Sequence, residues 1–192
     1  MKPTDTKTQI LDVAQDLIQR LGANGMSYKD ISEAVGIRKA SVHTHFPKKD
    51  DLLMALLERY SDRFRRVVDS ILATDESPET KLRRYCGLYE ANLSSSSQDK
   101  ACLCGMVGAE LATLNQPLAE QVCAFYQDNE ARLTMMLLEG QQTGDFRFAG
   151  EPEALAAVVF ASLQGGLLIA RAYGGAQKFQ SEIEQLMRLV KN

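Results

Sequence analysis

Helical periodicity runs through almost the entire chain and limits the folds that the chain can adopt. In residues 6–21, apolar side chains recur three and four positions apart, which places them on one stripe of a helix that packs on a core. The stripe consists of Ile10, Leu11, Ala14, Leu17, Ile18 and Leu21. No segment shows sustained strand-type alternation with hairpin turns between segments. We therefore predict an all-α protein of about nine helices.

Two short helices are predicted to follow the first one. Ser27 is the expected N-cap of the earlier helix, Asp30 stands three residues later in the position of a capping box, and Gly36 ends that helix. The later helix, residues 39–45, has little apolar surface to offer to a core, so most of it is left for another use. Two short helices that are joined by a tight turn and supported by a third helix indicate a helix-turn-helix.

Longer helices are predicted for the rest of the chain. One of them runs over residues 48–73, and a polar, proline-containing stretch at residues 73–80 follows it. Further helices are expected over residues 79–93, 102–114, 117–144, 152–173 and 177–190. The polar stretch at residues 93–101 is expected to be a loop. We predict a helix-turn-helix domain over residues 1–50 and a larger C-terminal domain over residues 51–192, linked by the long helix.

The charge of the chain is unevenly distributed. Residues 1–50 hold eight Lys and Arg against six Asp and Glu, a balance of +2. The remainder holds 14 against 19, a balance of −5, and the whole chain has a formal charge of −3. This asymmetry fits an N-terminal unit that meets a polyanion and a larger unit that does not.

Composition favours a cytoplasmic protein. A chain with 45% apolar residues can bury a core without disulfides, so its four cysteines are expected to remain thiols in a reducing compartment. No basic stretch followed by an apolar run opens the chain, and no signal peptide is expected. The most membrane-like window, residues 155–173, is interrupted by Gln164, two glycines and Arg171. We expect a buried helix there and no membrane partner.

Basic and hydrogen-bonding side chains concentrate around the second short helix. The exposed positions predicted for it are Arg38, Lys39, Ser41, His43 and Thr44, and an α-helix of this kind fits the major groove of DNA. Lys48 and Lys49 stand at a helix start, where cations are unfavourable unless an anion such as a phosphate lies beside them. Ser27, Tyr28 and Lys29 are placed to hold the DNA backbone across the groove. The alternative is that these charges are solvated surface groups and that the histidines, His45 above all, pack or cap a helix.

Residues 8–57 resemble the DNA-binding domain of the tetracycline-repressor (TetR/AcrR) family of bacterial transcriptional regulators. The matching pieces are "ILDVAQDLIQRLGANGMSYKDISEAVGI" and "KASVHTHFPKKDDLL". The resemblance implies a dimeric, ligand-responsive regulator, usually a repressor, that binds a double-stranded, palindromic DNA operator. It also implies that Lys49 contacts a phosphate, and that His43 replaces the family's phosphate-contacting Tyr. Arg38 and Lys48 stand where the family often has small polar N-caps.

The last two helices are predicted to form a homodimer. The helix over residues 152–173 is apolar nearly all round and must be covered on more than one side. Gly165 and Gly166 each weaken a helix interior by up to ~1 kcal/mol, which makes sense where another backbone approaches closely. Two helices from each chain would then form a four-helix bundle. The alternative is an ordinary core helix of a monomer.

The C-terminal domain should also hold an apolar pocket for an unknown small-molecule effector. The residues proposed to line it are Tyr85, Tyr89, Met106, Phe125, Tyr126, Met135, Phe160 and Gln164, and ordinary core packing is the alternative for each of them. Cys102 and Cys104 lie near a predicted helix start, where the helix dipole favours a reactive thiolate, so a thiol sensor is a further hypothesis. Buried, inert thiols are the alternative.

Enzymatic function is not supported by the sequence. A di-iron helical bundle needs Glu-x-x-His pairs, and both histidines lie in the first 50 residues without that spacing. Cys-x-Cys without a nearby His or a second Cys pair does not make a tetrahedral metal set. We expect no catalytic residues, no metal and no cofactor. A protein-interaction module without DNA binding remains a competing hypothesis.

Overall fold

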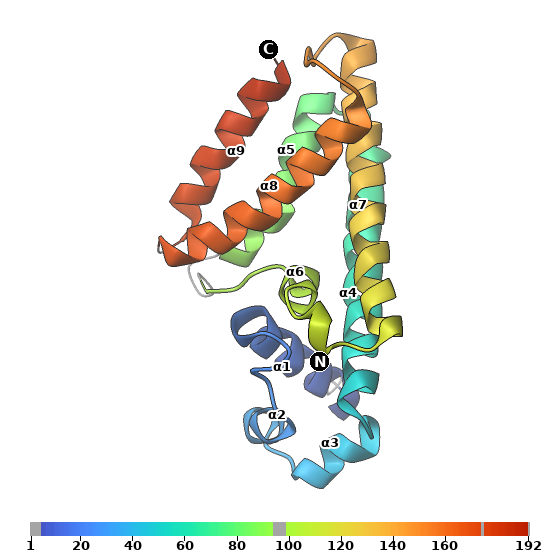
Figure 1. Ribbon diagram of the computed structural model, residues 1–192, viewed down its shortest axis with the longest axis vertical. Coiled ribbons are helices and arrows are strands. Elements are labelled where there is room, and N and C mark those ends of the chain that lie inside the picture. The colour runs from blue at the N-terminus through green and yellow to red at the C-terminus, as the bar shows by residue number, and fades with distance from the viewer. Residues whose placement is uncertain (1–4, 94–98, 174, 192) are drawn as a thin grey trace. The chain divides into compact units, whose positions relative to one another are not determined.

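The computed structural model of the chain describes residues 5–93, 99–173 and 175–191, and all regular structure in these ranges is helical (Figure 1). The α-helices are α1 (Thr6–Leu21), α2 (Tyr28–Val35), α3 (Lys39–His45), α4 (Lys49–Leu72), α5 (Pro78–Glu90), α6 (Leu103–Gly108), α7 (Gln116–Thr143), α8 (Pro152–Ala172) and α9 (Ala176–Lys191). Two 3₁₀ helices, η1 (Ala91–Leu93) and η2 (Leu111–Thr113), complete them. The all-α prediction is confirmed. Residues 94–98, in the expected loop, lie outside the described residues.

The chain divides into two compact units that do not follow the expected boundary. The first unit runs to Asp62 and also contains Leu103–Ala124; the second contains Arg63–Cys102 and the residues from Phe125 on. The division therefore falls inside α4 and α7. The segment Leu103–Ala124 was expected in the C-terminal domain, but α6 packs on α1 in the first unit.

The core of the first unit is built on α1, whose bounds match the sequence pattern. Asp5 caps the helix by accepting the backbone N–H of Thr8 at 3.0 Å. Ile10, Ala14 and Ile18 are fully buried on one stripe of α1, as three- and four-residue spacing requires. The helix ends at Gly22, whose φ of +83° is readily accessible to glycine. α1 thus gives α2 an apolar surface to pack on, and α3 packs in turn on α2.

The helix predicted over residues 102–114 is broken. It consists of α6 and η2, separated by Ala109 and Glu110. Glu110 leaves the helical region, with φ −111° and ψ +20°, and its carboxylate accepts the backbone N–H of Asn24 at 2.9 Å. A contact that spans 86 residues therefore accompanies the break, and local periodicity gives no sign of it.

In the second unit, α9 lies beside α5 and α8 (Figure 1). Ion pairs join α9 to α5: Arg83 binds Glu184 at 2.6 Å, and Lys191 binds Glu79 at 2.6 Å. By length and composition α8 could cross a membrane, and 39% of its most apolar window is buried within the chain. Val158, Leu168 and Ile169 of α8 are large apolar side chains that remain exposed.

Candidate nucleic-acid interface

Both ends of α2 are capped by the residues that the sequence singles out. The Ser27 Oγ accepts the backbone N–H of Asp30 at 3.3 Å, and the Asp30 carboxylate accepts the backbone N–H of Ser27 at 3.0 Å. The capping box is therefore confirmed. Gly36 ends α2 in the left-handed conformation, with φ +76° and ψ +33°. Both ends of α2 are thus held in place, and α3 begins three residues after Gly36.

α3 exposes most of its surface. In this helix, which lies wholly within the described residues, Val42 alone is buried, and Phe46 just after it is 3% exposed. Arg38, Lys39, His43 and Thr44 are exposed and Ser41 is half-buried. No side chain in the described part of the chain caps the start of α3, as expected with Arg38 at the N-cap. A short helix held by one apolar side chain and its neighbour leaves a polar face available for a ligand.

Tyr28 supports the interface from inside. Its ring is 8% exposed, and its hydroxyl lies 2.8 Å from the carbonyl oxygens of both Phe46 and Lys48. The hydroxyl thus holds the junction between α3 and α4. Burial is the main cause that raises the pKa of Tyr28 to about 12, and the nearby carboxylates of Asp51 and Asp50 add to it. The buried ring and the engaged hydroxyl show a supporting role for Tyr28 within the chain.

His43 lies directly against Tyr28. The two ring centroids are 4.7 Å apart with an interplanar angle of 60°, an edge-on contact. Because His43 is exposed on its other side, the imidazole is held on one face and can meet a ligand on another. His43 can therefore pack against Tyr28 and still contact a ligand.

The two lysines at the start of α4 have different surroundings. Lys48 is exposed, and its backbone N–H donates to Asp51 Oδ2 at 3.0 Å, which makes up for a missing N-cap. The ammonium of Lys49 donates to the carbonyl oxygen of Met26 at 2.8 Å. An ammonium has three donors, so Lys49 keeps two for an anion while its third anchors it. Lys29 is exposed and pairs with Glu33 at 3.7 Å.

Comparison with known proteins agrees with this geometry. Residues 10–56 match the family model described as bacterial regulatory proteins of the tetR family, and residues 78–186 match the one described as the tetracyclin repressor-like C-terminal domain. The second match alone covers more than half of the chain. The chain belongs to the TetR family. It is thus a DNA-binding transcriptional regulator of a family that does not consist of enzymes.

Solved structures of TetR-family regulators share the whole fold. One from Agrobacterium tumefaciens is 31% identical, with 97% of each chain covered and a TM-score of 0.90. Another from Legionella pneumophila is 28% identical, with 100% of each chain covered and a TM-score of 0.88. The HTH-type transcriptional repressor DhaR of Mycobacterium sp. strain GP1 is 23% identical over 168 residues, which cover 88% of this chain and 83% of DhaR. Regulators of this family bind operator DNA and work as dimers with small-molecule effectors.

An aromatic cluster occupies the second unit of this TetR-family chain. It consists of Phe64, Tyr85, Tyr89, Phe125, Tyr126 and Phe160, with neighbouring ring centroids 5.5–6.5 Å apart. Five of these six residues were predicted to line an effector pocket, and Phe64 was missed because it lies in the helix that was interpreted as a linker. Ring pairs at such distances stabilise a core by about 0.5–1.5 kcal/mol each.

Asn129 and Gln164 hold buried polar atoms in the second unit. The Tyr85 hydroxyl donates to Asn129 Oδ1 at 2.8 Å, and Asn129 is 2% exposed. The buried Nε2 of Gln164 has no hydrogen-bond partner in the described part of the chain. Of the two methionines proposed for the pocket, Met106 lies in α6 of the first unit. Met135 is 56% exposed, which contradicts its assignment to an enclosed pocket.

The thiols proposed as sensors are buried. Cys102 is 1% exposed and Cys104 is fully buried, whereas the exposed cysteine is Cys123. Burial also raises the pKa of the neighbouring Cys86 thiol to about 12. A reagent from solvent therefore has no direct access to Cys102 or Cys104 in this conformation, which argues against the accessible thiolate that the sensor hypothesis requires. In the described part of the chain, no group of three or more His, Cys, Asp or Glu residues could hold a metal ion.

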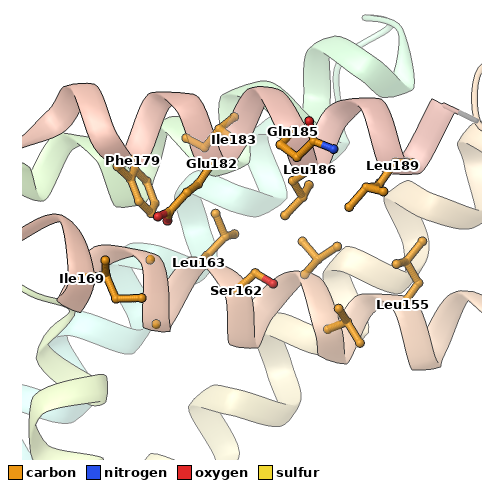
Figure 2. A pocket seen from close by; sticks show the side chains of 15 residues that line it. Leu155, Ser162, Leu163, Ile169, Phe179, Glu182, Ile183, Gln185, Leu186 and Leu189 are labelled. Atoms are coloured by element: carbon orange, nitrogen blue, oxygen red, sulfur yellow. The ribbon is translucent and has the colours of Figure 1, made fainter.

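An apolar groove runs between α8 and α9 (Figure 2). Val158, Ile169 and Leu189 border it and are 60%, 48% and 62% exposed. Its one charged lining residue among those described is Glu182, whose carboxylate points from α9 toward α8 (Figure 2). Three half-exposed aliphatic side chains on one groove are costly in water, which indicates that another surface covers them.

Proposed function

We propose that this TetR-family regulator is a cytoplasmic repressor whose dimer binds a palindromic operator and leaves it when a small molecule binds. The observation that carries the proposal is the polar, exposed face of α3, which follows an α2 that is capped at both ends. A two-fold dimer reads inverted half-sites, because the same helix enters the groove twice in opposite directions. The two reading helices must then lie about one helical turn of DNA apart, ~34–36 Å.

Base and phosphate contacts are assigned to different residues of the interface. Arg38, Lys39, Ser41 and Thr44 on α3 are proposed to meet base edges or the adjacent backbone in the major groove. His43, Lys48 and Lys49 are proposed to hold phosphates, together with the backbone N–H groups at the start of α4. Ser27 and Lys29 at the start of α2 are proposed to contact the backbone on the other side of the groove.

The groove between α8 and α9 is proposed as the dimer interface. Gly165 supports this assignment, since a Cβ added to it would meet no atom within 4 Å in the described part of the chain. A glycine in a helix interior weakens that helix by about 1 kcal/mol relative to Ala, and packing within the chain gives no reason for it. A second copy that approaches α8 closely at Gly165 supplies the reason. The same contact covers the apolar surface of α8, so we propose no membrane partner.

The aromatic cluster is proposed as the effector site. Its rings supply apolar surface, and the unpaired Nε2 of Gln164 offers a hydrogen-bond donor to a ligand. Among the residues predicted from the sequence, Tyr85, Tyr89, Phe125, Tyr126, Phe160 and Gln164 remain in this proposal.

A gel shift with the DNA upstream of the protein's own gene tests the proposed function. The purified protein should retard this DNA at low salt and release it as salt rises, because phosphate contacts set free condensed counterions. A Lys39→Ala and a Lys49→Ala variant should each bind more weakly. If binding to this DNA is absent at low salt, repression of its own promoter is wrong; if both variants bind like the parent protein, the assigned contacts are wrong.

A further inference from the structure

The connection between α6 and α7 holds the turn after α1. The Glu110 carboxylate accepts the backbone N–H of Asn24 at 2.9 Å, and the Asn24 side chain donates to the Thr113 hydroxyl at 3.1 Å. A Cβ added to Gly22 would lie 2.3 Å from Glu110 Oε1. The missing side chain at Gly22 therefore makes room for the carboxylate as well as allowing the positive φ. Residues almost 90 positions apart are joined here by two hydrogen bonds.

The same connection also holds the start of α4. The Asn115 Nδ2 donates to Asp50 Oδ2 at 2.8 Å, while the Asn115 Oδ1 accepts the backbone N–H of Leu118 at 3.0 Å. One amide thus caps α7 with its oxygen and holds the first turn of α4 with its nitrogen. Asp50 directly follows Lys49, so Asn115 acts on the residue next to the proposed phosphate contact.

A third contact closes a ring. The Lys49 ammonium donates to the carbonyl oxygen of Met26, two residues after Asn24. The turn after α1, the start of α4 and the α6–α7 connection are therefore each joined to the other two by hydrogen bonds. We call this arrangement the polar ring, and its members are Asn24, Met26, Lys49, Asp50, Glu110, Thr113 and Asn115.

We propose that Asn115, far outside the helix-turn-helix in sequence, is a positioning residue for DNA binding. The proposal rests on the phosphate contact assigned to Lys49. A lysine side chain is flexible, and fixing it on a phosphate costs conformational entropy. The polar ring meets that cost before DNA arrives, because it fixes both the backbone at the start of α4 and the direction of the ammonium. Without the ring, the ammonium no longer stays on the phosphate and the contact is lost.

Exchange of two residues tests the contact between Asn115 and Asp50. Asn115→Asp keeps the oxygen that caps α7 but turns the donor into a carboxylate that faces the carboxylate of Asp50. Adding Asp50→Asn restores the hydrogen bond with donor and acceptor exchanged. Asp50→Asn alone shows what the loss of one negative charge near DNA does by itself, and Lys49→Ala shows what loss of the phosphate contact does.

Affinity and its salt dependence are measured with a DNA duplex that the parent protein enriches from a random pool. Asn115→Asp should weaken DNA binding about tenfold per dimer. Each of the two helix-turn-helix units loses a hydrogen bond to the charged carboxylate of Asp50. Asn115→Asp should also make the slope of log K against log salt shallower by about 2, as Lys49→Ala does, because one phosphate contact is lost per helix-turn-helix unit. The exchanged pair should recover both quantities. A general loss of stability would not change the slope.

Two results would overturn this inference. One is an Asn115→Asp variant that folds and binds with the parent's affinity and slope; the other is an exchanged pair that binds no better than Asn115→Asp. If circular dichroism shows that Asn115→Asp does not fold, Asn115→Ser, which keeps a cap for α7, must show the same weakening and shallower slope, and its failure to do so also overturns the inference. A parent protein that enriches no duplex overturns the proposed function together with this inference, whereas unchanged variants of a binding parent overturn this inference alone.

Discussion

Tyr28 shows how one buried side chain can support a proposed binding surface. Its hydroxyl reaches two carbonyl oxygens on either side of Pro47, and its ring contacts the imidazole of His43. The sequence singled out Tyr28 but did not reveal these contacts. The partners lie 18 and 20 residues away, and local patterns do not reveal which of two exposed-looking residues turns inward.

Tyr28→Phe should lower the free energy of unfolding by about 1–2 kcal/mol, because the one hydroxyl proton that Phe46 O and Lys48 O share is lost. Chemical denaturation measures this loss. Tyr173→Phe is a matched control: Tyr173 is 74% exposed, and its loss of a hydroxyl should change stability by less than about 0.5 kcal/mol. Equal effects of the two substitutions would contradict the role assigned to Tyr28.

The stability that Tyr28 contributes should depend on pH. Its pKa is raised from 10.0 to about 12 in the folded state, so the unfolded chain loses the Tyr28 proton first as pH rises. The contribution is therefore complete below about pH 10 and is lost as pH rises through about 12. The difference in unfolding free energy between the parent protein and Tyr28→Phe should shrink over this range. A constant difference would show that the hydroxyl is not responsible.

His43 gives the interface a chemical form that differs from the Tyr usual in the resembling family. A Tyr hydroxyl can donate to a phosphate as an imidazole N–H can. His43→Tyr should therefore preserve DNA binding. Fluorescence anisotropy with a labelled duplex measures the affinity of both proteins. Complete loss of binding in His43→Tyr would show that the assigned phosphate contact is wrong.

Helix bounds that nearby residues set were predictable from the sequence, whereas a break that involves a distant residue was not. The bounds of α1 and α3 agree with the sequence pattern, because apolar spacing, Asp5 and Pro47 set them locally. The break between α6 and η2 was missed, because it coincides with a hydrogen bond between Glu110 and Asn24, which lie 86 residues apart in the sequence. One signal was available for a tight approach: Gly22 is followed closely by a second glycine, although nothing near it in sequence identifies Glu110 as the partner.

Helix α8 contains two adjacent glycines, and the structure explains each of them differently. A Cβ on Gly166 would lie 2.3 Å from the carboxylate of Glu182 and 3.2 Å from the ring of Phe179, so packing within the chain accounts for this glycine. A Cβ on Gly165 meets nothing. The sequence pattern marked both as sites of close approach, and the structure separates the glycine that faces α9 from the one that is open.

Gly165→Ala should strengthen the helix yet weaken the dimer. The matched control is Gly87→Ala in α5, where an added Cβ also meets nothing. Both substitutions should favour the helix by up to ~1 kcal/mol, but only the one in α8 should clash with a second copy. We expect its dimer dissociation constant to rise at least about tenfold, since overpacking costs about 1–3 kcal/mol. Sedimentation over a dilution series measures this, and equal dimer affinities in the two variants would contradict the proposed interface.

For the molecule as a whole, the sequence predicted the family and the helix-turn-helix better than the division into two units. The helix-turn-helix has a local signature in its caps, its turn and its short polar helix. The first unit also takes in Leu103–Ala124. The packing of α6 on α1 and single polar pairs between distant positions hold this segment there. The proposed effector site had a compositional sign in its aromatic residues, and exposure decided which candidates to keep. Met135 is 56% exposed, whereas the rings of α4, α5, α7 and α8 gather in the second unit.

The central claim is that a dimer presents α3 to two inverted half-sites of DNA. Selection of bound duplexes from a random pool by the purified parent protein tests this claim most directly, because it requires no knowledge of the target gene. We expect an enriched inverted repeat with half-site centres about 10–10.5 base pairs, or a multiple of that, apart. A Lys39→Ala, Lys49→Ala double variant should enrich no sequence. Enrichment of no sequence, or of a single site without inverted symmetry, would contradict it.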